Sequence, residues 1–183
     1  MTRFFFMLAM AVTATSAAQE PPPAVSVREA AGAYVVEARF QVAASPAIVR
    51  RVLTDYAGIP RFMPDIRSSI VRRRAGDSVV VEQEAESKFL LFSKTVHLLL
   101  DVREHDRVIA FRDLCGRSFN RYEGSWRLSG NGAGALVIYT LTADPSFKVP
   151  APVIKKLLER NARQTIDYLR AEAVLRATRE PRP

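Results

Sequence analysis

The chain has 183 residues, which suits one domain and is too short for two ordinary ones. Hydrophobic residues make up 48% and charged residues 25%, a composition that excludes a disordered or collagen-like chain. The formal net charge of +8 favours anionic partners or anionic membrane surfaces. The single cysteine, Cys115, excludes an intramolecular disulfide, and with only His97 and His105 we expect no multi-histidine metal centre and no cofactor.

Residues 1–18 have the pattern of a secretory signal peptide. A positively charged start precedes an apolar run from Phe4 to Val12, which is too short to span a bilayer as a helix. Small residues then precede a cleavage point after Ala18. We therefore expect an exported, periplasmic protein that begins at Gln19 and has no nucleic-acid partner. An uncleaved anchor is the alternative.

The mature chain is predicted to hold one folded domain. Residues 19–24 form a proline-rich linker, because a proline run joins neither a helix nor a central strand. The domain is expected over residues 25–178, with a disordered tail at 179–183. Residues 34–42 carry the β-branched and aromatic side chains of its first strand.

A short helical region follows this strand. Ser45 and Pro46 have the residue types of an N-cap and a first helical position, and the helix is predicted to run to about Leu53. Residues 55–64 contain two prolines and a glycine, so we expect a bent segment with at most a short helix there.

The middle of the chain is predicted to form successive strands separated by turns. In one of them Glu82, Glu84 and Glu86 alternate with apolar residues, which indicates a solvated outer surface opposed by arginines of the preceding strand. The expected strands cover residues 66–74, 78–87, 89–102, 107–113, 119–128 and 135–143.

A long amphipathic helix is predicted from about residue 150 to residue 178. Strands followed by this helix predict an α+β fold, in which an antiparallel sheet of about six or seven strands carries the C-terminal helix on one face. A small apolar ligand would occupy the space enclosed between them. The face of the helix away from its apolar stripe carries Lys155, Lys156, Arg160, Arg163 and Arg170, and we expect it to contact anionic membranes transiently.

Three segments carry recognisable motifs. Residues 55–64 contain I-P and F-M-P, residues 122–128 a G-S-W-R-L strand, and residues 132–141 a G-A-G-A-L-V-I-Y-T-L strand. In this order and spacing they resemble the START-like (SRPBCC) polyketide cyclase and coenzyme Q-binding group. Ala135 stands where that group often has threonine. The resemblance covers residues 25–175. It implies the helix-grip fold, in which a curved antiparallel sheet wraps around the C-terminal helix and encloses a hydrophobic cavity.

No catalytic constellation is visible. His105 is predicted to be solvated in a turn, and His97 to lie on an outer strand face, with a pocket or catalytic role as its alternative. Cys115 has no basic partner that the sequence predicts, so we interpret it as a small buried hydrophobic residue.

The predicted ligand site combines apolar walls with a few polar groups. Gln83 interrupts an apolar strand face, and Asn161 lies on the apolar stripe of the last helix. Both are candidates for orienting a ligand, and the alternative is a buried amide that the backbone satisfies. The predicted ligand-binding residues are Phe62 and Met63 at the mouth, together with Gln83, Ala85, Phe89, Phe111, Tyr122, Trp126, Tyr139, Leu157 and Asn161.

These observations predict a monomeric carrier for a hydrophobic small molecule, such as a lipid or an isoprenoid or quinone-like compound. The alternative from the enzyme class is a cyclase or dehydratase acting on a polyketide-like or aromatic substrate in the same cavity. A third possibility is an interaction module that engages a membrane or a partner through its basic face.

Overall fold

The computed structural model describes residues 22–89, 92–130, 132, 134–148 and 150–180, and of residues 88, 89, 92 and 93 it describes the backbone alone. The predicted signal peptide, the first part of the linker and the last residues of the predicted tail lie outside this range.

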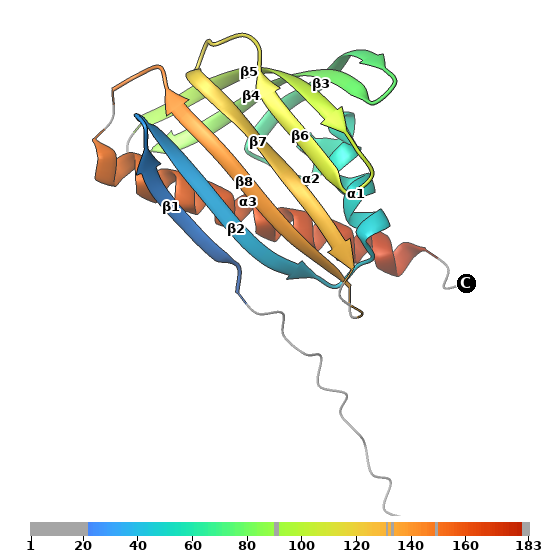
Figure 1. Ribbon diagram of the computed structural model, residues 1–183. Helices are drawn as coiled ribbons and strands as arrows, with labels where there is room; N and C mark the ends of the chain where they lie inside the picture. Colours follow the sequence, from blue (N-terminus) through green and yellow to red (C-terminus); the bar gives the residue numbers. More distant parts are fainter. Residues whose placement is uncertain (1–21, 90–91, 131, 133, 149, 181–183) are drawn as a thin grey trace, which may run out of the picture.

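An eight-stranded antiparallel sheet forms one layer of the protein. Its strand order is β1-β2-β8-β7-β6-β5-β4-β3, and each strand pairs antiparallel with its neighbours. Figure 1 shows how the sheet curves across its width. The strands are β1 (Ala24–Ala30), β2 (Ala33–Val42), β3 (Ile66–Ala75), β4 (Ser78–Phe89), β5 (Phe92–Glu104), β6 (Val108–Asp113), β7 (Phe119–Gly130) and β8 (Ala135–Pro145).

The sheet has eight strands where six or seven were predicted, because the residues of β1 were assigned to the linker and the start of the domain. A tight turn joins β1 to β2, with Ala31 at φ 50° and Gly32 at φ 77°. Two positive φ values are the requirement of a type I′ hairpin turn, which usually has Asn or Asp at its first position. With alanine at that position, the sequence carries no signal for a hairpin turn.

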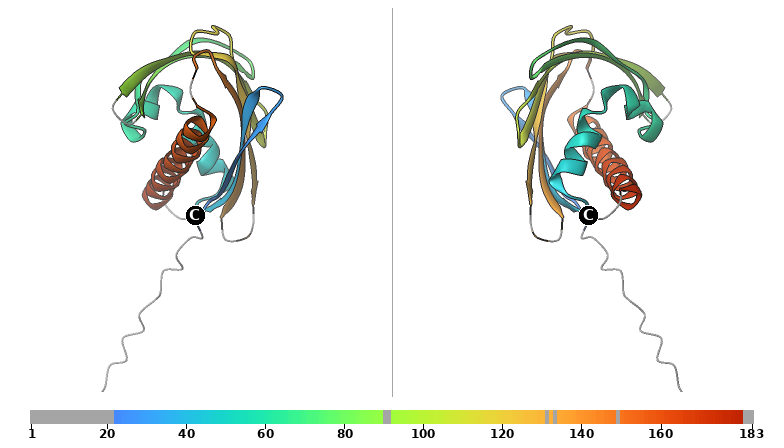
Figure 2. Two further views of the ribbon diagram at one scale, coloured as in Figure 1. Left: turned by 90° about the vertical axis from the view of Figure 1, so that its left-hand side faces the viewer. Right: turned by 90° about the vertical axis from the view of Figure 1, so that its right-hand side faces the viewer.

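The helices lie in the concave face of the sheet (Figure 2). Helix α1 (Pro46–Thr54) begins as predicted, with the Ile48 N–H donating to the Ser45 Oγ at 3.3 Å. The bent segment contains the short helices η1 (Tyr56–Gly58) and α2 (Ile59–Phe62). Helix α3 (Ala151–Arg179) crosses the sheet and buries one stripe of side chains, namely Ile154, Leu158, Ala162, Ile166, Leu169 and Ala173. In the described residues no helix has the length and apolar character needed to cross a membrane.

Two cations of the predicted basic face of α3 contact the edge of the sheet. Arg170 turns back onto β2, where its Nε donates to the Gln41 carbonyl at 2.9 Å and its guanidinium lies 5.4 Å from the centre of the Phe40 ring. Arg163 donates to the Pro23 carbonyl at 3.2 Å. These contacts arise because β1 and β2 run alongside α3, so its flanking cations reach the sheet edge.

Candidate ligand-binding site

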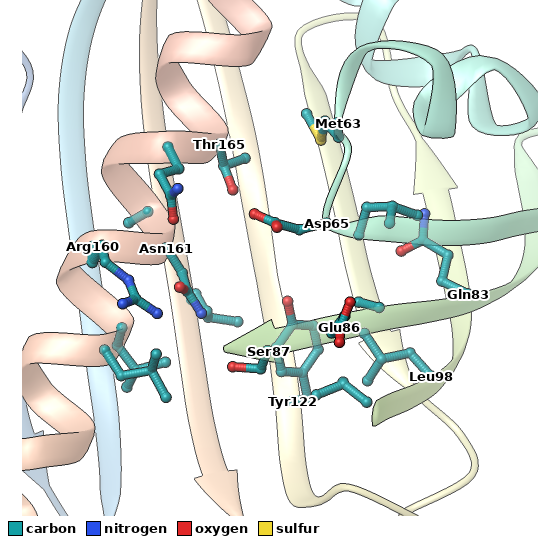
Figure 3. A pocket seen from close by; sticks show the side chains of 18 of the residues that line it. Met63, Asp65, Gln83, Glu86, Ser87, Leu98, Tyr122, Arg160, Asn161 and Thr165 are labelled. Carbon is teal, nitrogen blue, oxygen red and sulfur yellow. The ribbon is translucent and has the colours of Figure 1, made fainter. Parts of the chain in front are cut away.

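A cavity of about 470 Å³ lies between the sheet and α3. Its walls come from β4, β5, β7 and β8 on one side, from α3 on the other, and from the segment that joins α2 to β3 (Figure 3). This volume falls in the lower half of the range of about 300–1,000 Å³ that is usual for pockets holding drug-sized ligands.

The sheet side of the cavity is mostly apolar because strand alternation directs every second residue inward. In the β4–β5 pair, Ala85 lies opposite Val96 and Gln83 lies opposite Leu98, so these four residues share one face. Phe119 of β7 and Leu141 of β8 extend the apolar wall. The body of a ligand placed here would contact hydrocarbon and aromatic carbon.

Polar side chains gather where α3 faces the end of β4 (Figure 3). Arg160, Asn161 and Thr165 come from α3, while Asp65 and Glu86 come from the opposite side. Glu86 is neutralised by an ion pair with an arginine, in which the Arg67 Nη2 lies 2.7 Å from the Glu86 Oε2.

The Asp65 carboxylate differs from that of Glu86. The main-chain carbonyl of Asp65 accepts a hydrogen bond from the Glu86 N–H at 2.8 Å, which ties the segment after α2 to β4. Among the described residues its carboxylate has no hydrogen-bond or ion-pair partner. A ligand therefore meets a charged acceptor on this wall.

Gln83 has both a structural and a cavity-facing role. Its Nε2 donates to the Ser69 Oγ at 3.1 Å, and Ser69 itself is buried on β3. The amide is thus held by a side chain of the neighbouring strand and not by the backbone, as the alternative for this residue had it, and it still lines the cavity.

Two tyrosines bring hydroxyl groups to the cavity. The Tyr139 ring stacks on Trp126 with centroids 4.0 Å apart, and the Tyr122 ring packs 4.8 Å from Phe119. Burial raises the pKa of Tyr122 to about 12, with a smaller contribution from the charge of Asp113. Burial also raises the pKa of Tyr139 well above its ordinary value, and the nearby Tyr122 adds to this shift. Both phenols are therefore neutral near pH 7.

Comparison with protein families matches residues 33–174 to the family described as polyketide cyclase / dehydrase and lipid transport. The chain belongs to this family. The match confirms the predicted START-like assignment and the helix-grip fold, whereas coenzyme Q binding stays a prediction. A comparison with curated protein sequences finds no match.

Solved structures of the same fold come from several bacteria. A STAR-related lipid transfer protein from Xanthomonas axonopodis has a TM-score of 0.69 at 16% identity, covering 86% of this chain and 96% of that chain. The Zhui aromatase/cyclase from Streptomyces sp. R1128 has a TM-score of 0.66 at 21% identity, covering 78% and 94%. A START superfamily protein from Mycobacterium smegmatis has a TM-score of 0.67 at 20% identity, covering 77% and 97%. At these identities the likeness shows the fold alone.

Most of the predicted site residues of this family member come together in the cavity. Phe89 ends β4, and its side chain lies outside the described part of the chain. The predicted residues that line the cavity are Met63, Gln83, Ala85, Tyr122, Tyr139, Leu157 and Asn161.

Three predicted site residues do not line the cavity. Trp126 and Phe111 share the inward face, but Trp126 stacks against Tyr139 and the Phe111 ring lies 5.9 Å from Tyr122, so these two side chains support the tyrosines. Phe62 packs beside the core under the Arg176 guanidinium, 5.8 Å from its ring centre.

Several residues that line the cavity were not predicted from the sequence, although the spacing of some of them along α3 could have identified them. Gln164, Thr165 and Tyr168 follow Asn161 by three, four and seven positions, the spacing that puts them on the same helix face. Arg160 was instead assigned to the outer face. Asp65 had no comparable signal, because its position depends on the path of the chain after α2.

The other chemically reactive candidates lie away from the cavity. The His105 side chain is largely exposed, with its Nδ1 3.7 Å from Asp77. The His97 side chain is half-buried, with its Nδ1 4.0 Å from Glu84. Cys115 is half-buried rather than buried, and its thiol donates to the Asp113 Oδ1 at 3.2 Å. The interpretation of Cys115 as a buried hydrophobic residue was therefore wrong.

Glu86 corrects one further prediction. Glu82 pairs with Arg72 and Glu84 lies by His97, as expected of an outer surface. Glu86 instead sits where β4 reaches the cavity and contributes to its polar side.

Proposed function

We propose that this protein is an exported carrier that holds one apolar small molecule, of the lipid or isoprenoid and quinone-like class, between its sheet and α3. The observation that carries the proposal is the cavity of about 470 Å³, with its apolar sheet wall and its polar groups concentrated on α3 and the end of β4. Membership in a family whose description includes lipid transport supports it.

The arrangement of the walls suits a ligand with an apolar body and a small number of polar atoms. Val96, Leu98 and Phe119 would cover the body, and burying that surface supplies the main free energy of binding. Asn161 would fix the orientation of a polar group, since an amide offers both donors and an acceptor.

Native mass spectrometry of the protein isolated from its own periplasm, followed by solvent extraction, tests the carrier function. We expect a retained apolar compound, or stoichiometric uptake of the neutral probe Nile red by ligand-free protein. Protein of bare polypeptide mass that also takes up no Nile red would rule out the proposal.

Replacing Asn161 with leucine is expected to weaken binding of a ligand with a polar group by about 1–3 kcal/mol, the usual cost of leaving a buried polar atom unpaired. Binding of a purely apolar probe should hardly change, because leucine preserves the apolar contacts. Calorimetric titration with a fatty alcohol and its parent alkane measures the difference. Equal losses for both compounds would mean that Asn161 acts only through packing.

Export is the second part of the proposal, supported by the signal-peptide pattern of residues 1–18. The intact mass of protein recovered from the periplasm should correspond to a chain starting at Gln19, within one residue. Recovery of the protein with Met1 retained in the cell interior would contradict export.

A cyclase or dehydratase reaction in the same cavity is the second candidate. The Asp65 carboxylate favours it, because a carboxylate beside bound substrate can act as a general base. Incubation with a poly-β-ketone distinguishes the two functions by mass and chromatographic retention. A carrier returns the compound with both unchanged, a cyclase returns an isomer of equal mass and different retention, and a dehydratase product is lighter by one water.

A further inference from the structure

Residues 59–65, which we call the α2 segment, reach from the C-terminal end of α3 to the cavity. The segment begins with α2 and continues through Met63 and Asp65, which line the cavity. Figure 3 shows the Asp65 side chain extending toward the side of the cavity that α3 forms. Because α2 contacts both α3 and β3, the segment bridges the long helix to the edge strand of the sheet.

Apolar packing holds the α2 segment only lightly. Of the four residues of α2 none is buried, and Ile59 and Phe62 pack beside the core while staying partly exposed. At the far end of the segment the Asp65 carbonyl accepts the Glu86 N–H at 2.8 Å, which ties that end to β4. The end beside α3 therefore depends on polar contacts, and segments with few buried apolar contacts open at a low cost in free energy.

Four alternating charges hold this end of the segment to α3. The Asp55 Oδ2 accepts hydrogen bonds from the Arg61 Nη2 at 3.1 Å and from the Arg176 Nη2 at 2.7 Å. The Arg176 Nε donates to the Glu172 Oε1 at 2.7 Å, and its guanidinium lies 5.8 Å from the centre of the Phe62 ring. We call the four charged residues the Arg176 latch, because this arginine of α3 contacts both Asp55 and the α2 segment.

The burial of the latch lets it hold the segment and still open. The side chains of Asp55, Glu172 and Arg176 are 29%, 18% and 23% exposed, so salt screens their attraction less than that of a surface pair. Charge-assisted hydrogen bonds of this kind are stronger than neutral ones. Since none of the three side chains is fully buried, water can solvate each charge when the latch breaks.

Gly58 supplies a second and independent observation on the latch. A Cβ at this position would collide with the Asp55 carboxylate and with the Arg61 guanidinium. The Gly58 backbone has φ −86° and ψ −16°, a conformation open to other residues, so alanine would displace this ion pair without straining the backbone. The pair between Asp55 and Arg61 thus closes over a position that has no side chain.

We propose that the α2 segment is the gate of the cavity and that the Arg176 latch holds it closed. A ligand enters and leaves when the latch breaks and the segment moves away from α3. This inference rests on the proposed function, since it concerns how the same cavity exchanges its ligand. The empty and the loaded protein share the latch, so its loss speeds entry and exit alike and leaves the affinity nearly unchanged.

Stopped-flow mixing with Nile red tests the gate in wild-type protein and in the variants Arg176→Met and Gly58→Ala. Methionine keeps the unbranched stem of arginine and removes its charge and its hydrogen bonds. We expect the association rate and the dissociation rate each to rise about tenfold in both variants, equivalent to about 1.4 kcal/mol of barrier, while the Kd changes less than about threefold.

Arg51→Gln is the matched control for these variants. Arg51 of α1 forms an ion pair with Glu180 at the same end of α3 but lies outside the latch, so its loss should leave both rates unchanged. Thermal melting verifies the fold of each variant, and Gly58→Ala decides the question if Arg176→Met unfolds. Wild-type rates in either folded variant, or equal acceleration in Arg51→Gln, would overturn the gate and leave the carrier function intact. Wild-type protein that takes up no Nile red would overturn both.

Discussion

Replacing Ala85 with phenylalanine is expected to abolish the uptake of an apolar probe while the protein remains folded. Ala85 lies on β4 opposite Val96, and its small side chain lines the cavity. A phenylalanine there would extend into space that a ligand needs, rather than into packed atoms. Nile red titration of the purified variant should show affinity reduced by at least about a hundredfold, with a thermal unfolding midpoint close to that of the wild type.

Ala110→Phe provides the matched control for this prediction. Ala110 lies on β6 opposite Arg103 and Ser125, on the outer face of the sheet, so the same added volume should leave probe uptake unchanged. If the cavity were in truth close-packed, Ala85→Phe would instead overpack it and destabilise the protein by about 1–3 kcal/mol. That result, together with wild-type protein that takes up no probe, would contradict the carrier function.

The fold was largely predictable because its signals are local and repeated. Alternating strands, the Ser45 N-cap and the long period of α3 each predict their own element, and their order permits few arrangements. The hairpin between β1 and β2 was not predicted, because Ala31 adopts a positive φ that alanine rarely shows. Without this turn, β1 was not recognised as a strand.

The motif that carried the family resemblance has a packing reason in the structure. Gly124 precedes Trp126 by two positions on the inward face of β7, where a Cβ would collide with the carbonyl oxygen of Thr140 and with the Phe111 ring. Glycine is needed there because Thr140 and Phe111 approach the β7 backbone closely. The sequence motif contains this glycine but does not show why it is required.

The sequence predicted which side chains point to the inner face of the sheet, but not which of these border the cavity. Alternation correctly directed Tyr122, Trp126 and Tyr139 inward, yet only the packed structure shows that Trp126 lies against Tyr139 instead of lining the cavity. Asp65 was missed for a related reason. Its place beside the end of β4 depends on tertiary contacts between distant segments, which no local period encodes.

Two leucines of α3 are expected to respond very differently to the same substitution. Leu157 lines the cavity, whereas Leu169 is completely buried against the sheet. The same helix thus carries positions that border the binding site and positions that anchor it in the core.

Leu169→Ala should therefore lower the free energy of unfolding by about 2–5 kcal/mol, the range for deleting a large buried aliphatic side chain. Leu157→Ala should cost only about 1 kcal/mol, because a side chain that borders open space has fewer packed neighbours to lose. Urea unfolding of the two variants measures the difference, and equal costs would contradict the distinction between these two positions. A stable Leu157→Ala protein with altered probe affinity would place Leu157 in the binding site, since the enlarged cavity changes the contacts of the ligand without loosening the core that holds α3.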